Sequence, residues 1–196
     1  MTNEIDVTHI RNLDVTANPA AVSLTAIGAA LVLLSLSNAG AFGVGSMILA
    51  MAFFYGGLAP IIGGLMEWKK NNTFGLTTFL SFGFFFLSFV GLLVLPKLGL
   101  AAPESASGMA AYFAIWGLIT FVLFIASLKT IWALKLVLGL ITLLLFLLAI
   151  GAQTGNATVT TVAGYEGILT GFVTIYAGLA QVLNEVYGKT VAPVGG

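Results

Sequence analysis

The residues best suited to bind a small solute stand where long apolar runs of this chain begin. Asn18-Pro19 opens the first run. Asn is a good helix N-cap, and Pro suits the first helical position. The pair has two interpretations. It is a plain helix start, or its free N–H groups and positive dipole end attract a small anion such as a carboxylate at the mouth of a pathway.

A second polar group enters the third apolar run. Asn72 and Thr73 begin it, and Thr77 follows one turn later. Positions 73, 77, 80 and 81 share one face of a helix. The hydroxyl groups on this face suit the wall of a pathway that contains water. The alternative is that they bond back to carbonyls of their own helix.

The second run carries Pro60, which removes a backbone donor and leaves the carbonyl of Gly56 without its usual helical partner. A kinked helix is one explanation. A freed carbonyl that lines a polar passage is the other.

Three acidic residues lie in or beside the apolar runs. Glu67 and Glu185 end the second and sixth runs, where charged residues commonly anchor helices at the membrane interface. Glu166 lies deeper. It either gates protons or stands in an outer vestibule bathed in water, and we favour the vestibule.

Enzyme signatures are missing from the sequence. It has no cysteine, its one histidine is His9 in a polar N-terminal stretch, and no phosphate-binding loop motif occurs. No paired carboxylates lie within the apolar runs, so neither general acid–base nor nucleophilic catalysis is indicated. We expect no enzymatic activity, no metal and no cofactor. Zero net charge gives no indication of nucleic acid binding.

The elements that must position these residues are membrane-spanning helices. Only 7% of residues are charged and 59% are hydrophobic, with a mean hydropathy of +1.09, so a bilayer suits this surface better than water. Runs of about 18 or more apolar residues indicate spans, and barrel strands would be about half as long with strict alternation. The sequence predicts an all-α membrane protein whose transmembrane domain covers residues 18–188. The expected spans are 20–38, 44–66, 74–95, 109–128, 132–152 and 163–184.

The placement of Lys and Arg predicts the orientation. With six spans, only Lys97 falls on one side, and the other six of the seven basic residues fall on the opposite side. Cytoplasmic loops carry such an excess, so both termini are expected in the cytoplasm. Residues 1–17 do not have the basic start and apolar stretch of a signal peptide. We interpret residues 1–17 and 189–196 as cytoplasmic tails.

The basic residues also indicate three helical hairpins in series. Lys70, Lys129 and Lys189 each follow an even-numbered span, at intervals of 59 and 60 residues. The spacing reflects either an internal structural repeat or bilayer thickness alone. The 24 glycines allow close helix packing in lipid, which fits a tight bundle, an oligomer or a narrow pore.

Five sequence blocks resemble the acetate uptake transporters (the SatP/YaaH group and its fungal relatives). Residues 18–24, Asn-Pro-Ala-Ala-Val-Ser-Leu, are similar to the Asn-Pro-Ala-Pro-Leu-Gly-Leu signature of that family. The other four blocks occur in family order and at family spacing. They are residues 54–57, 70–77, 95–100 and 183–185.

The resemblance implies a six-helix bundle that moves acetate, and in some members succinate, across the cytoplasmic membrane. It also implies a homo-hexamer with one pathway per protomer. The residues then expected to bind substrate or line the pathway are Asn18, Pro19, Tyr55, Asn72, Thr73 and Thr77.

The family pathway is shaped like an hourglass, and the resemblance places its waist at Ile27, Phe82 and Ile141. Bacterial relatives have Phe, Tyr and Leu there. The three residues lie nine positions after Asn18, Thr73 and Trp132, which stand at or just before the starts of their spans. Nine residues rise about 13.5 Å, close to the middle of a roughly 30 Å hydrocarbon core. Core packing is the alternative for each residue taken alone.

The chain departs from the family pattern at several positions. Ala21 and Ser23 replace the second proline and the glycine of the signature, so the first turn is expected to sit differently. Pro60 stands where glutamine is usual, which removes a possible amide ligand. Glu166 replaces a residue that is usually apolar.

The leading hypothesis is a transporter or channel for acetate and similar small carboxylates. A bare anion loses much solvation at an apolar waist, whereas neutral acetic acid loses far less. The sequence shows no obvious buried proton carrier, which favours a passive or loosely proton-linked mechanism. The alternatives are a channel for uncharged solutes or water, and a structural membrane scaffold without flux.

Overall fold

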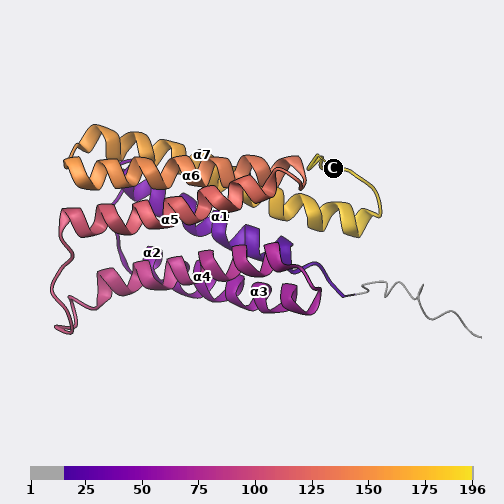
Figure 1. Ribbon diagram of the computed structural model, residues 1–196, viewed down its shortest axis with the longest axis horizontal. Helices are drawn as coiled ribbons and strands as arrows, with labels where there is room; N and C mark the ends of the chain where they lie inside the picture. The colour runs from indigo at the N-terminus through magenta and orange to yellow at the C-terminus, as the bar shows by residue number, and fades with distance from the viewer. Residues whose placement is uncertain (1–15, 196) are drawn as a thin grey trace, which may run out of the picture.

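The computed structural model describes residues 16–195, and every regular element within them is helical, as the sequence predicts. His9, Arg11 and most of the predicted N-terminal tail lie outside the described residues. Six helical stretches are long and apolar enough to cross a membrane (Figure 1). They are α1 (Pro19–Asn38), Ser46–Lys69, α4 (Thr73–Val94), α5 (Ala106–Ser127), α6 (Trp132–Thr154) and α7 (Ala157–Tyr187).

The second stretch consists of three consecutive helical segments: α2 (Ser46–Ala50), the π-helical η2 (Met51–Leu58) and α3 (Ala59–Lys69). Pro60 is the second residue of α3, so the π-helical segment lies directly before it. A π-helix bonds each residue to the fifth one along instead of the fourth, which is one way that a helix absorbs a disturbance in its ladder. Pro60 therefore changes the helix type without ending the span.

Polar caps fix where the helices begin. The Oδ1 atom of Asn18 accepts a hydrogen bond from the N–H of Ala20 at 3.0 Å, and Asn72 caps α4 in the same way. The prediction that Asn18 and Asn72 begin helices is thus confirmed. The largest boundary error is at α7, which begins six residues before its predicted start. Gly155 ends α6 at a φ of 61°, and Asn156 caps α7 at once, so the expected last loop contains only these two residues.

The helices form one bundle in which α1 packs most extensively against α7. The pairs α5 and α6, α6 and α7, and α3 and α4 also pack closely, whereas the backbones of α4 and α5 lie farther apart and are joined by aromatic side chains. The spans follow one another up and down as three sequential pairs, in agreement with the predicted topology (Figure 1). In the middle pair, however, large aromatic side chains separate the two backbones, and rings such as Phe85 of α4 and Tyr112 of α5 stack across the contact. The candidate site lies beside this aromatic contact.

Glycine brings α1 and α7 together. A Cβ atom on Gly28 would lie 2.6 Å from the carbonyl oxygen of Gly171, and one on Gly171 would lie 2.8 Å from the carbonyl oxygen of Gly28. Only residues without a side chain permit this approach. Small residues are the usual means of close helix packing in lipid.

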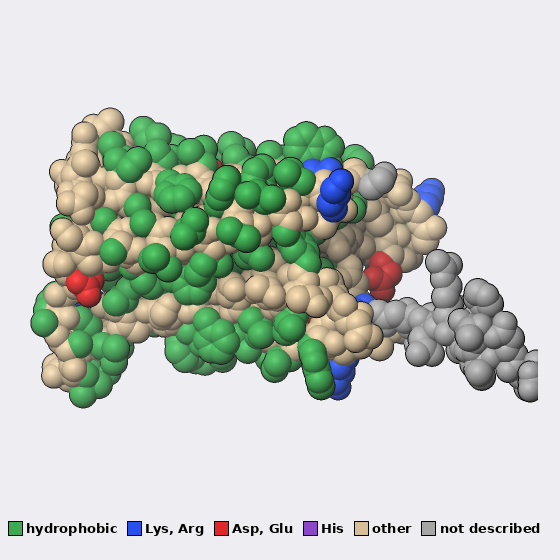
Figure 2. Space-filling model, in the orientation of Figure 1, with side chains coloured by type: hydrophobic (Ala, Val, Ile, Leu, Met, Phe, Trp, Pro, Cys, Tyr) green, Lys and Arg blue, Asp and Glu red, His purple; other side chains and the backbone are tan. Residues whose placement is uncertain are grey.

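Both ends of the described chain lie at the same end of the bundle, which we call the inner end (Figure 1). Lysine side chains gather at this end of the visible face, while hydrophobic side chains cover its middle (Figure 2). By the alternation of the spans, Lys97 lies at the opposite, outer end, between α4 and α5. This distribution agrees with the expected charge asymmetry.

The last described residues form a strap across the inner end, whereas the sequence predicted only a tail at 189–196. The Asn184 side chain accepts hydrogen bonds from the backbone N–H groups of Val191 and Ala192. The N–H of Trp132 donates to the carbonyl of Gly195, and the N–H of Ala133 donates to that of Val194. The strap thus satisfies the first donors of α6, which has no side-chain cap.

Candidate functional site

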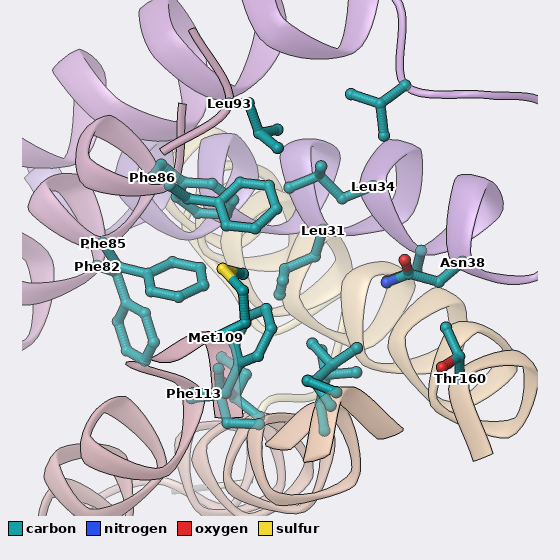
Figure 3. Close-up of a pocket in the computed structure, with 18 residues that line it drawn as sticks. Leu31, Leu34, Asn38, Phe82, Phe85, Phe86, Leu93, Met109, Phe113 and Thr160 are labelled. Carbon is teal, nitrogen blue, oxygen red and sulfur yellow. The ribbon is translucent and has the colours of Figure 1, made fainter. Parts of the chain in front are cut away.

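A cavity of about 260 Å³ lies between α1, α4, α5 and α6 (Figure 3). Its wall is almost entirely hydrocarbon, and none of its residues is charged. Such a volume holds several waters or one small solute. The lining residues are Leu31, Leu34, Ser35, Asn38, Val44, Phe82, Phe85, Phe86, Phe89, Leu93, Met109, Phe113, Ile141, Leu144, Leu145, Leu148, Ala152 and Thr160.

The cavity has a polar outer part and an apolar inner part. Asn38 at the end of α1 and Thr160 in the first turn of α7 lie together on the side away from Phe82 (Figure 3). At mid-bundle depth the wall is aromatic and aliphatic. A solute that enters from the outer end therefore first meets the amide of Asn38 and the hydroxyl of Thr160, and then only hydrocarbon side chains as it moves inward.

The predicted waist residues lie at the inner limit of this cavity. Phe82 and Ile141 line it, and their side chains are 4% and 2% exposed. Ile27 is 2% exposed and belongs to the same apolar core, one turn inward of the lining residue Leu31. The three helix middles thus face the bundle interior. Their role as a constriction for substrate stays a prediction.

Asn18 and Tyr55 share a different feature, an open groove beside α1. Its wall also includes Thr25 of α1 and Glu185 of α7. The Nδ2 atom of Asn18 donates to Oε1 of Gln181 at 2.7 Å, so both ends of the Asn18 amide are engaged within the protein. Pro19 is buried at the first position of α1. Binding of substrate by these residues stays a prediction.

Asn72, Thr73 and Thr77 are exposed on the outside of α4. Asn72 caps the helix through Oδ1 and donates through Nδ2 to Oε2 of Glu67 at 2.7 Å. These residues do not line the cavity that contains Phe82. A substrate contact at Thr73 or Thr77 stays a prediction.

The structure also buries a polar group that the sequence did not single out, Thr78, and a carboxylate that it did, Glu67. Thr78 is 5% exposed, and its hydroxyl has no hydrogen-bond partner within the described residues. It precedes Phe82 by one helical turn, a spacing that puts both on one helix face. The four-residue spacing between Thr78 and Phe82 is the feature of the sequence that could have identified Thr78 as a pathway candidate. Glu67 is only 3% exposed, beside the start of α4, so other parts of the protein cover its carboxyl group; its role as an interface anchor stays a prediction.

Glu166 of α7 is half-buried. Its Oε1 atom accepts a hydrogen bond from the Thr170 hydroxyl at 2.8 Å. Its Oε2 atom is buried without a partner among the described residues, while the residue as a whole is half-buried, so the vestibule role stays a prediction. Glu166 does not belong to the cavity wall.

Comparison with known proteins agrees with this architecture. Residues 6–194 match the model of the GPR1/FUN34/yaaH family. The succinate-acetate/proton symporter SatP of Escherichia coli K12 is 45% identical over 179 residues, covering 91% of this chain and 95% of SatP. Ammonia transport outward protein 2 of Saccharomyces cerevisiae is 35% identical over 180 residues, covering 86% of this chain and 64% of the yeast protein.

A solved structure is similar as well. The structure of the bacterial acetate channel SatP superimposes with a TM-score of 0.91 at 44% identity, covering 92% of this chain and 99% of the other. The fold, the number of spans and the sequence therefore agree with one family over nearly the whole chain. The protein is a member of the GPR1/FUN34/yaaH family of multi-pass membrane proteins.

Proposed function

We propose that this protein carries acetate and similar small carboxylates across the cytoplasmic membrane by a channel-like or proton-linked route. The observation that carries the proposal is the uncharged cavity that ends at Phe82 and Ile141, in a bundle with a TM-score of 0.91 to an acetate channel. The similar bacterial protein is named as a succinate-acetate/proton symporter, which supports the same substrate class.

The chemistry of the cavity wall favours passage as the neutral acid. An isolated carboxylate in an apolar surrounding loses hydration that hydrocarbon does not replace, whereas an uncharged acid loses much less. Phe82 and Ile141 offer no charge and no hydrogen bond. Protonation outside the waist, followed by release of the proton on the far side, links proton movement to acetate without a dedicated carrier.

We propose further that both termini face the cytoplasm and that six copies assemble, with one pathway in each. The orientation rests on the excess of lysine at the inner end. The assembly rests on the family resemblance. Cysteine accessibility labelling at the strap and native mass spectrometry of the purified protein test these two points.

We propose further that the chain is not an enzyme, which is supported by the names of its relatives as transporters or channels. A second candidate is a channel for small uncharged solutes. The same apolar waist admits such molecules, and the yeast relative is named as an ammonia transport protein.

Uptake of labelled acetate into proteoliposomes distinguishes these candidates. At matched total acetate, the neutral-acid route predicts faster uptake at about pH 5 than at about pH 8, because the fraction of neutral acid falls as the pH rises. Equal rates at the two pH values reject that route. Vesicles that swell in urea or glycerol but take up no acetate support the uncharged-solute channel instead.

A further inference from the structure

Thr78 holds a hydroxyl that the fold buries and leaves unused. The side chain is 5% exposed, and its Oγ1 atom has no hydrogen-bond partner within residues 16–195. It is the only hydroxyl oxygen in that part of the chain that is both buried and unpartnered. A buried polar group without a partner is costly, so its presence calls for a ligand or a water that completes it.

Other buried hydroxyls in this bundle behave differently. Thr120, Thr142 and Thr174 each donate to the backbone carbonyl four residues earlier, at 2.7 to 2.8 Å. This bond to the helix's own backbone is the ordinary solution for a threonine inside a membrane helix. Thr78 has the same opportunity in α4 and does not use it. Its hydroxyl is therefore available to another partner.

The position of Thr78 relates it to the waist. Thr78 is one turn, about 6 Å, inward of Phe82 on the same side of α4. Phe82 forms the inner limit of the cavity together with Ile141 of α6. On α5, the spacing from Met109 and Phe113 to the buried Thr120 places that residue on the cavity-facing side too. A solute that passes Phe82 next meets the level of Thr78.

We propose that the Thr78 hydroxyl is a specificity-determining donor for the transported acid, immediately inward of Phe82. The ligand class is a small monocarboxylic acid or its carboxylate, whose oxygen atoms accept a hydrogen bond. This inference rests on the proposed transport of carboxylates. The carboxyl group of the passing acid supplies the acceptor that the fold does not provide for this hydroxyl.

The test compares Thr78→Val, which keeps the shape of the side chain and removes the hydroxyl, with Thr78→Ser, which keeps the hydroxyl. Thr142→Val is the matched control, because it removes a buried hydroxyl that is already bonded to its own helix. Each full-length protein is reconstituted in proteoliposomes for labelled acetate uptake. Thermal unfolding in detergent is measured in parallel.

We expect Thr78→Val to lower the rate of acetate uptake roughly tenfold, the effect of one hydrogen bond to a charged or strongly polar group. Thr78→Ser and Thr142→Val retain most of the uptake. The unfolding temperature of Thr78→Val stays the same or rises, because an unsatisfied hydroxyl has been removed. A purely structural role predicts the opposite shift in unfolding temperature.

Two results would overturn the inference. One is uptake by Thr78→Val at the wild-type rate. The other is loss of folding or thermal stability in Thr78→Val, which would mean that the hydroxyl serves the fold. Failure of the wild-type protein itself to take up acetate would instead reject the proposed function.

Discussion

The side-chain amide of Asn18 joins the first and last spans, because its Nδ2 atom donates to Oε1 of Gln181 at 2.7 Å. The same side chain caps α1 through its Oδ1 atom. Gln181 in turn donates to the carbonyl of Ala177 within α7. The asparagine that opens the family signature therefore ties the start of α1 to the end of α7.

Replacing Asn18 by alanine removes both the cap and this bond. We expect a loss of about 2 kcal/mol in the free energy of unfolding, about 1 from the cap and about 1 from the hydrogen bond. Asn156→Ala is the control, because Asn156 caps α7 without an interhelical bond and its loss costs only about 1 kcal/mol. Chemical denaturation in detergent measures both. Equal losses would contradict a contribution from Gln181.

Gly171→Ala tests the close approach of α1 and α7. The new methyl group would meet Val32 and the carbonyl oxygen of Gly28 at 2.6 and 2.8 Å, so one helix has to move. We expect a destabilisation of about 1–3 kcal/mol, the usual cost of overpacking. Gly91→Ala in α4 is the control, since its nearest neighbour would lie 4.0 Å away. Unfolding temperatures compare the two, and similar values would argue against tight packing at Gly171.

Phe82→Ala tests the waist. Removing the ring widens the inner limit of the cavity, so the rate of butyrate uptake relative to acetate should rise by roughly tenfold, the effect of about one methylene in an apolar pocket. Phe84→Ala on the same helix is the control, because Phe84 is 53% exposed on the outside of the bundle. Ile141→Val is a milder probe from α6. Unchanged selectivity in Phe82→Ala removes Phe82 from the pathway.

Asn72→Ala tests how the buried carboxylate of Glu67, which lies in α3 beside the start of α4, is stabilised. The variant removes the Nδ2 group of Asn72 that donates to the Glu67 carboxylate, and it also removes the Oδ1 cap of α4. Hydrogen bonds to charged groups contribute about 1.5–3 kcal/mol, so the loss in unfolding free energy should clearly exceed that of Thr73→Ala, an exposed neighbour. Denaturation midpoints measure the difference. A loss no larger than that of Thr73→Ala would show that Glu67 has another source of stabilisation.

The sequence predicts the bounds of the spans well. It predicts less well which face of each helix lines the cavity. Apolar length determines a membrane helix, so α4 lies within one residue of its predicted bounds. The interval of nine residues between Thr73 and Phe82 determines depth only. Nine residues make roughly two and a half turns, so the two side chains lie on opposite sides of α4. Thr73 is accordingly exposed, whereas Phe82 lines the cavity.

Other features depend on backbone and side-chain contacts that form only in the folded chain. The sequence indicates a disturbance at Pro60 but does not specify the π-helical form of the segment before it. The strap bonded to Trp132 and Ala133 involves backbone groups that composition does not encode. Burial of Glu67 likewise requires the turn between α3 and α4 to bring Asn72 back over it. Hydropathy and charge counts carry no information about such pairings.

The partnership of α1 with α7 bears on how the protein is made. The ribosome delivers α1 first and α7 last, so the earliest helix spends most of translation without its principal neighbour. Until α7 arrives, the glycine face around Gly28 is left to lipid or to other proteins of the insertion machinery. Assembly of the bundle is therefore completed after synthesis of its final helix, and a chain that stalls before α7 would leave its first helix unpaired.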